Sequence, residues 1–324
     1  MTGAASEEDC VVTGTWSGSD VAALFERVRN WGAWGPDDER GTLNYLTPDK
    51  VAAAAACAVS GRTVSCARDF PVHPHPENPF PAQHHMVVAG DDPCVPGGHG
   101  LETSMDYIGI AFHGMASTHI DALCHVFVRG RMYNGWPATD VKSTGARRNS
   151  IMCAKDGIVG RGVLLDLPRV AGVPYLDPGP EITPADLEAA EHAQDVVVGE
   201  GDIVLVRTGR DVRRESVPTS TPDGQRLAGL HPSCAEWLHA RRVAALGGDG
   251  VHDPLPGGAR YEDWPVPIHM CALAGMGLHL LDNLWLEDLA AACGDAGRWA
   301  FLMTIAPLRI ERGTGSPVNP IAVL

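Results

Sequence analysis

The feature that most constrains the fold is an alternation of strand and helix patterns along the second half of the chain. Short apolar segments bounded by turn residues predict one strand at 107–112 in the first half and others at 162–167, 202–208, 243–246 and 299–305. Helical spacing predicts helices at 233–242 and 285–293, between the last three of these strands. Such alternation favours an α/β protein with a mixed sheet. The apolar run at 203–206 predicts a strand that is buried on both faces.

Capping residues predict two further helices. The run Thr47-Pro48-Asp49 opens an alanine-rich segment, and Gly61 follows its end. Threonine as the capping residue, proline in the first turn and glycine beyond the last turn are typical of the two ends of a helix. The same order of threonine, proline and aspartate at 183–186 predicts a helix that runs to about residue 192.

The chain shows no strong linker, so we expect one domain. Residues 1–20 are polar and are predicted to form a flexible N-terminal segment, with a single domain over 21–324. The region 70–100 contains many prolines and glycines together with five histidines. We expect a long irregular loop there, and loops of that length inside a domain are commonly functional.

Composition excludes several classes of protein. The formal net charge of −15 disfavours a nucleic-acid partner, because an acidic surface repels the phosphate backbone. No apolar run reaches the roughly 18 residues that a membrane helix requires, so we expect no membrane association. The nine cysteines include no Cys-x-x-Cys pair, and the small, acidic first ten residues do not resemble a secretory signal. We therefore expect a cytoplasmic protein.

One apolar segment, 112–127, concentrates side chains that bind metal ions: His113, His119, Asp121 and His125. If residues 118–122 are extended, His119 and Asp121 point to the same face, and His125 rejoins it if the chain turns into a helix. Imidazole with carboxylate suits zinc, manganese or iron better than calcium or magnesium. Each histidine alone could be an ordinary core residue. Together with the aspartate they would leave costly buried polar groups without a cation.

The motif Thr118-His119-x-Asp121-x-x-x-His125 resembles the signature of the metal-dependent cyclase family, also called the kynurenine formamidase-like hydrolases. Three other segments, 34–44, 130–135 and 307–318, resemble parts of its larger bacterial members. The resemblance covers the chain from about residue 31 to its end. It implies a swivelling β/β/α domain, in which mixed sheets form a barrel-like core with peripheral helices.

The resemblance also implies roles for individual residues. His119 and Asp121 would bind a divalent metal ion, zinc or manganese, and His125 would be the catalytic acid/base. His269 and Asp282 fit the place of the family's distant histidine and carboxylate ligands.

The chain departs from the family pattern at three positions. Met115 stands four residues before His119, where the family has a histidine, and His113 would replace that histidine only through a two-residue bulge. Leu123 replaces a proline, and Asp282 stands where compact members have glutamate. One metal ion is therefore the simpler expectation.

Four residues outside the motif are candidates for substrate binding: His85, Trp136, Arg207 and His252. Each has an alternative interpretation. His85 could be loop surface and Trp136 could be packing. Arg207, at the end of a predicted strand, could bind a substrate carboxylate or pair with a neighbouring side chain. His252 follows a predicted strand, where functional residues are common.

The family resemblance predicts a metal-dependent hydrolase of a C–N or C–O acyl bond in a small molecule, such as an amide, formamide, lactam or lactone. Metal-activated water would attack and His125 would transfer the proton. No Gly-x-Ser-x-Gly motif marks a serine nucleophile. The alternatives are a metal-dependent cyclase, dehydratase or lyase, and a metal-free ligand-binding relative. Members usually form homo-oligomers, so we expect one here.

Overall fold

A nine-stranded mixed sheet forms the centre of the protein in this computed structural model, which describes residues 16–92, 99–256 and 261–324. In spatial order the strands are β1 (Thr63–Ser65), β13 (Ile321–Val323), β11 (Ala300–Ile305), β7 (Ile158–Asp166), β8 (Ile203–Arg207), β9 (Ala245–Gly248), β10 (His279–Asp282), β4 (His119–Asp121) and β12 (Gly315–Pro317). Strands β7 to β10 are parallel to one another and the remaining pairs are antiparallel. The predicted α/β class with a mixed sheet is confirmed.

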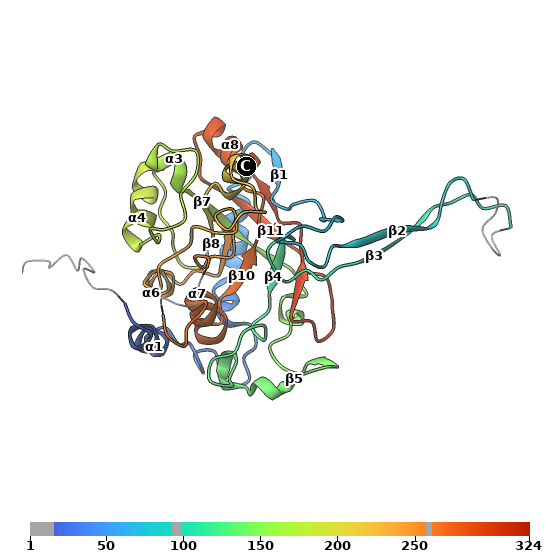
Figure 1. Cartoon of the computed structure of the whole chain (residues 1–324). Coiled ribbons are helices and arrows are strands. Elements are labelled where there is room, and N and C mark those ends of the chain that lie inside the picture. The colour runs from blue at the N-terminus through green and yellow to red at the C-terminus, as the bar shows by residue number, and fades with distance from the viewer. Residues whose placement is uncertain (1–15, 93–98, 257–260) are drawn as a thin grey trace, which may run out of the picture.

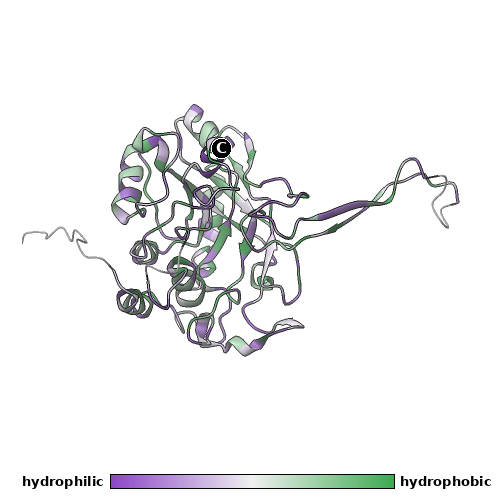
Figure 2. Cartoon of the chain, viewed as in Figure 1, coloured by the Kyte–Doolittle hydropathy of each residue, from purple (hydrophilic) through white to green (hydrophobic). Residues whose placement is uncertain are grey.

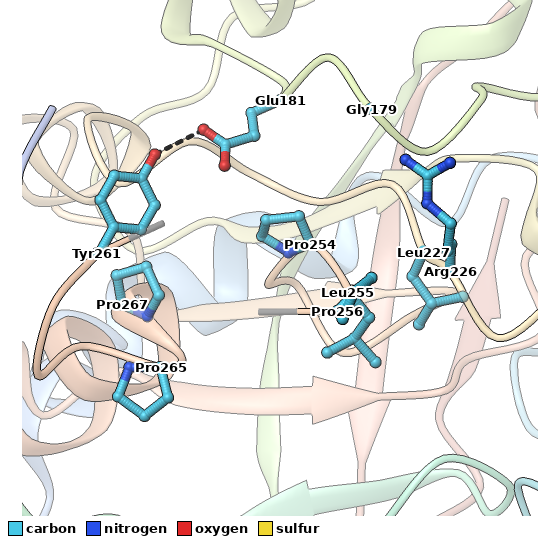
Figure 3. Close-up of a pocket in the computed structure, with 10 residues that line it drawn as sticks. All are labelled: Gly179, Glu181, Arg226, Leu227, Pro254, Leu255, Pro256, Tyr261, Pro265 and Pro267. Carbon is cyan, nitrogen blue, oxygen red and sulfur yellow. Dashed lines mark hydrogen bonds between the residues drawn. The ribbon is translucent and has the colours of Figure 1, made fainter. Parts of the chain in front are cut away.

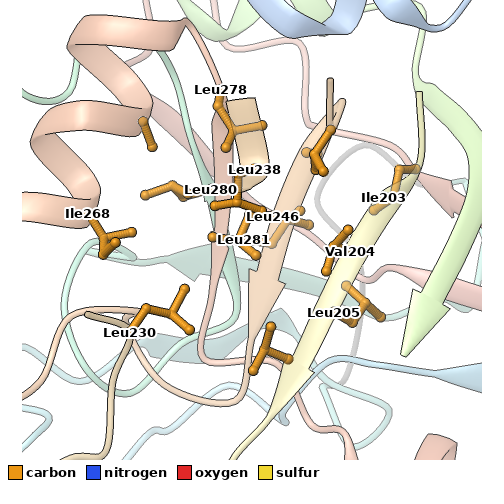
Figure 4. Close-up of a cluster of buried hydrophobic side chains, with 14 of the residues drawn as sticks. Ile203, Val204, Leu205, Leu230, Leu238, Leu246, Ile268, Leu278, Leu280 and Leu281 are labelled. Atoms are coloured by element: carbon orange, nitrogen blue, oxygen red, sulfur yellow. The ribbon is translucent and has the colours of Figure 1, made fainter. Parts of the chain in front are cut away.

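The hydrophobic core lies against the parallel strands. Figure 2 shows hydrophobic residues gathered on these central strands. All five residues of β8 are buried, as the apolar run at 203–206 predicted. Figure 4 shows its side chains beside those of β9 and β10, with Leu238 and Ile268 among them. Burial of such a continuous apolar layer is the main force that holds the strands together.

Helices surround the sheet (Figure 1). They are α1 (Gly18–Arg27), α2 (Pro48–Ala55), α3 (Leu167–Ala171), α4 (Pro184–Ala193), α5 (Arg210–Ser216), α6 (Cys234–Ala240), α7 (Pro267–His269), the π-helix η5 (Met270–Met276) and α8 (Glu287–Ala296). Short 3-10 turns are η1 (Gly41–Tyr45), η2 (Tyr133–Gly135), η3 (Ala138–Asp140) and η4 (Ile151–Ala154). No helix in the described part of the chain is both long and apolar enough to cross a bilayer.

The predicted helix starts are confirmed at both capping sequences. The Thr47 side chain accepts a hydrogen bond from the Lys50 backbone, 3.4 Å away, at the start of α2. At α4, the Thr183 hydroxyl and backbone N–H both donate to the Asp186 carboxylate, each at 2.7 Å. These caps satisfy N–H groups that have no partner inside the helix.

One expectation about the first half of the chain was wrong and another is confirmed. The region predicted as an irregular loop over 70–100 contains strand β2 (Gln83–Val88), and its residues 93–98 lie outside the described residues. The strand predicted at 107–112 is present as β3 (Met105–Gly109), which ends three residues earlier than predicted and pairs with β2. Figure 1 shows β2 and β3 running away from the body as a two-stranded arm. A second small hairpin pairs β5 (Val141–Lys142) with β6 (Gly145–Ala146).

The predicted flexible segment, 1–20, falls mainly on residues 1–15, outside the described residues. Gly18 to Asp20 form the first turn of α1, where the Ser17 backbone N–H donates to the Asp20 carboxylate at 2.8 Å. Helix α1 packs on the body through three buried side chains, Val21, Leu24 and Phe25. The one-domain organisation remains a prediction.

Candidate metal centre

Strands β4 and β10 bring the first ligands together. His119 and Asp121 alternate with Ile120 along β4 and so share a face, as predicted. Asp282 on β10 pairs directly with His119 across the antiparallel ladder. His119 Nε2 lies 3.4 Å from Asp121 Oδ1 and 4.0 Å from Asp282 Oδ2. Strand pairing alone therefore juxtaposes one imidazole and two carboxylates.

Two further histidines approach Asp282 from other segments. His269 ends α7, and its Nε2 lies 3.3 Å from Asp282 Oδ2 and 3.7 Å from Asp121 Oδ2. His252 follows β9, and its Nε2 lies 3.3 Å from Asp282 Oδ1. Because β9 and β10 are adjacent and parallel, the residues at their carboxyl ends meet at the same edge of the sheet.

His113 and His125 complete the cluster on its more accessible side. His113 Nδ1 lies 3.0 Å and His125 Nε2 lies 4.0 Å from Asp121 Oδ1. The two rings stack in parallel with centroids 3.9 Å apart. His125 reaches the site through a turn, in which its N–H donates to the Ala122 carbonyl at 2.9 Å, so the helix that we gave as a condition is not required. Their side chains are 27% and 31% exposed, so the cluster is open to solvent on this side.

The polar atoms in this cluster lack ordinary partners. Both carboxylate oxygens of Asp121, Oδ1 of Asp282 and Nδ1 of His113 are buried without a hydrogen-bond partner. Unpaired buried polar atoms are costly. Ligand atoms of His113, Asp121 and His125 lie within 4.8 Å of one another, and so do those of His119, Asp121 and Asp282. The cluster therefore fits a divalent cation, which would satisfy these atoms, and Asp121 belongs to both ligand groups.

Hydrogen bonds on the outer sides of two rings orient them. His119 Nδ1 lies 2.9 Å from the Ser117 carbonyl, to which it donates, and this leaves Nε2 facing the carboxylates. His269 Nδ1 lies 2.6 Å from Asp253 Oδ2. A carboxylate or carbonyl behind a ligating imidazole is the usual way to fix its tautomer and orientation.

Asp253 is a residue that the sequence analysis missed. Its carboxylate is fully buried, and it also accepts the backbone N–H groups of Ile268 and His269 at 2.8 and 3.1 Å. The available signal was an aspartate next to a candidate histidine just beyond a strand, in the sequence Val-His-Asp-Pro. Its partner lies 16 positions away, so the sequence did not show the pairing.

The cluster shifts the pKa values of its members. Burial would raise the pKa of Asp121, but the neighbouring imidazoles of His113 and His119 hold it well below its usual range. Burial would lower the pKa of His119, but Asp121 and Asp282 outweigh it and raise that pKa to about 9. For His125 burial dominates and lowers the pKa to about 4. His125 is therefore a neutral imidazole at pH 7, able to accept a proton.

A separate cavity of about 240 Å³ lies beside the segments that carry His252 and His269 (Figure 3). Its wall includes Pro254 and Pro267, and the Tyr261 hydroxyl donates to Glu181 at 2.7 Å. None of the cluster's side chains lines it. Proline fixes one backbone dihedral, so these prolines stiffen the two segments next to the ligands.

The predicted substrate-binding residues are placed in different surroundings. Arg207 pairs with Glu287 through two hydrogen bonds of 3.0 and 2.7 Å and with Asp166 at 2.7 Å. These contacts correspond to the alternative in which Arg207 pairs with neighbouring side chains. His252 has a side chain only 1% exposed and lies within the cluster.

The other two candidates make contacts outside the cluster. His85 lies on the arm, with its ring 4.9 Å from that of Tyr107. The Arg148 guanidinium lies 4.1 Å above the Trp136 ring. Substrate binding by either residue remains a prediction.

Comparison with known proteins identifies the group to which the chain is related. A family described as putative cyclase matches residues 63–252, more than half of the chain and including β4 with its ligands. The chain belongs to the cyclase family.

Individual relatives agree with this assignment. A crystal structure described as that of a novel cyclase superposes with a TM-score of 0.82 at 33% identity, covering 91% of this chain and 99% of the other. The isatin hydrolase of Roseibium aggregatum is 28% identical over 214 residues, 64% of this chain and 71% of that protein. Isatin hydrolase A from Labrenzia aggregata, bound to benzyl benzoate, shares the fold at 24% identity, with a TM-score of 0.57 over 87% of this chain and 98% of the other. The expected cyclase fold is thus confirmed.

Proposed function

We propose that this cyclase-family protein is a metal-dependent hydrolase that cleaves a C–N or C–O acyl bond in a small molecule, such as an amide, formamide, lactam or lactone. The observation that carries the proposal is the convergence of five histidines and two aspartates with unpaired carboxylate oxygens at the end of β4 and β10. The similarity to an isatin hydrolase supports hydrolysis of a small molecule.

We propose zinc or manganese as the ion, held by His119, Asp121, His269 and Asp282, with His113 on the accessible side. Imidazole nitrogen and carboxylate oxygen together favour these ions. When bound there, such an ion would supply Lewis-acid chemistry, which polarises an acyl carbonyl and lowers the pKa of water.

His125 is the proposed acid/base. Its imidazole is neutral at pH 7, because its pKa is lowered to about 4 by burial, and its side chain is 31% exposed. It accepts the proton of the attacking water at Nε2, which lies 4.0 Å from Asp121 Oδ1, and returns that proton to the leaving nitrogen or oxygen. The stacked ring of His113 keeps the imidazole in place. Such positioned proton transfer typically contributes about 10²- to 10⁴-fold in rate.

The test combines metal analysis with two variants and a control. The protein, purified without chelator, is expected to contain zinc or manganese. His119→Ala should lose the metal, His125→Ala should keep it but lose turnover of an amide, lactam and lactone panel, and His239→Ala should behave like the wild type. His239 bonds to Asn30 at 3.0 Å, away from the cluster. Hydrolysis in oxygen-18 water must label the acid product.

Three outcomes would contradict the proposal. A protein that neither contains nor takes up a transition metal would be the metal-free ligand-binding relative. Turnover without oxygen-18 in the product would indicate cyclase, dehydratase or lyase chemistry. Full activity of His125→Ala would remove that residue from the reaction.

Assembly and location are proposed on separate observations. Exposed apolar side chains on the arm, among them Val87 at 59% and Ile108 at 50% exposure, support a homo-oligomer that covers them. Light scattering of the purified protein measures its mass, and a monomeric mass would refute this. The seven described cysteines are all free, which supports the reducing cytoplasm.

A further inference from the structure

The loop in front of β4 brings His113 much closer to His119 than the chain length between them suggests. An extended chain advances about 3.3 Å per residue, so six residues would separate the two by roughly 20 Å. The ring centroids are 5.2 Å apart. The loop must therefore fold back on itself, and it does so at Gly114, whose φ of +131° suits glycine.

A single side chain holds the two ends of this loop together. Nδ2 of Asn283 donates to the Gly114 carbonyl at 2.8 Å and to the Ser117 carbonyl at 3.1 Å. Asn283 is fully buried and follows the ligand Asp282 directly. Its φ of +56° lies in the left-handed region, which asparagine adopts more readily than most residues. The amide thus connects the end of β10 to the loop that carries His113.

Arg210 fixes the orientation of that amide. Its Nη1 donates to Asn283 Oδ1 at 2.5 Å, which leaves Nδ2 facing the two loop carbonyls. Its Nη2 donates to the Met115 carbonyl at 2.7 Å. The side chain of Arg210 is only 2% exposed. Together the two residues bind the carbonyls of three of the four loop residues, and buried carbonyls require such partners.

His113 directly precedes this loop and has a defined orientation. Nε2 of His113 lies 3.0 Å from Thr314 Oγ1, so this nitrogen can donate to the hydroxyl. Nδ1 then faces Asp121 Oδ1 at 3.0 Å. The position of this nitrogen depends on the loop, because the six-residue spacing does not by itself bring His113 to the cluster.

We propose that Asn283 is the positioning residue for His113: its amide folds the 114–117 loop so that a histidine two residues out of the family's position reaches the metal centre. The inference rests on the proposed function for its metal-binding consequence. The side-chain hydrogen bonds of Asn283 go to Gly114, Ser117 and Arg210, and none of them goes to a candidate ligand atom.

The test uses Asn283→Asp in the full chain. This change keeps the size of the side chain but turns an oxygen toward two carbonyl oxygens, so the loop loses both bonds and meets repulsion. Zinc affinity, measured by competition with a chelator, is expected to fall about tenfold or more, as it does when residues behind ligands are changed. The visible spectrum of the cobalt-substituted protein should change as His113 leaves. Asn283→Gly tolerates the positive φ and should give the same loss if the aspartate variant does not fold.

The control is Asn149→Asp. Asn149 is also fully buried, has a φ of +57° and donates to a backbone carbonyl, that of Tyr133, at 2.8 Å. This variant is expected to lose stability and keep the zinc affinity of the wild type. The His113→Ala variant completes a double-mutant cycle with Asn283→Asp. If Asn283 acts through His113, the double variant binds zinc as weakly as His113→Ala alone.

Two outcomes overturn the inference: an unchanged zinc affinity in both Asn283 variants, or a double variant in which the two losses multiply. Nitrogen-15 NMR of the histidine rings in the metal-free protein distinguishes failure of the inference about Asn283 from failure of the proposed function. The His113 ring signals should change in Asn283→Asp and not in Asn149→Asp. If the wild type binds no metal, the proposed function fails, and an unchanged His113 signal would still refute the role of Asn283.

Discussion

Asp253 is expected to act on the metal centre through His269, and Asp253→Asn tests this. The carboxylate accepts three N–H groups: those of the Ile268 backbone at 2.8 Å, the His269 backbone at 3.1 Å and the His269 ring at 2.6 Å. The other ring nitrogen of His269 lies 3.3 Å from Asp282. Any movement of the ring on the Asp253 side therefore changes the ligand geometry on the other side.

The expected loss of folding free energy in Asp253→Asn follows from counting those hydrogen bonds. With its oxygen toward His269, the asparagine amide keeps two of the three bonds and turns its NH₂ toward the Ile268 N–H. One buried donor is then unsatisfied, which costs about 1–3 kcal/mol of folding free energy. The bond to His269 Nδ1 also loses its charge, which makes the imidazole a weaker ligand. Loss of such a partner typically costs about 10- to 100-fold in metal affinity.

The assay measures zinc affinity by chelator competition and folding stability of the metal-free protein by urea unfolding. The control is Asp202→Asn, because Asp202 is also buried and accepts a backbone N–H, from Gly199 at 2.7 Å, but touches no imidazole. It should lose stability without loss of zinc affinity. An affinity of Asp253→Asn within about threefold of the wild type, or an equal loss in the control, would refute the role of Asp253 in orienting His269.

Two predictions concern ion pairs away from the centre. Arg207→Met should lower the free energy of unfolding by about 3–5 kcal/mol, since it leaves Asp166 and Glu287 without their cation, and should leave KM unchanged. A KM raised more than about tenfold would instead favour substrate binding. Burial would raise the pKa of Glu77, but Arg210 and Arg214 lower it below 4.5. The stability from this carboxylate is present above pH 4.5 and is lost as the pH falls through the folded-state pKa. In urea unfolding at several pH values, the free energy of unfolding of Glu77→Gln should fall less on acidification than that of the wild type.

The helices and the buried strands could be predicted because their signals are local. Threonine and aspartate at 183–186 form a cap with atoms only three residues apart, and the apolar run at 203–206 suits a strand covered on both faces. The arm was missed for the opposite reason. Strand β2 contains Gln83 and two histidines and is mostly exposed, so no hydrophobic alternation marks it, and its pairing with β3 spans an intervening segment.

The sequence by itself determined the central part of the candidate site. A strand alternates its side chains between two faces, so His119 and Asp121 shared a face whatever packed around them. The tertiary structure decided which distant groups met there. Asn283 and Arg210 fold the loop of His113 from more than 90 positions away, and Arg207 pairs with Glu287 from 80 positions away. Dihedral preferences act between chain neighbours, whereas these contacts exist only after the sheet has brought its strand ends together.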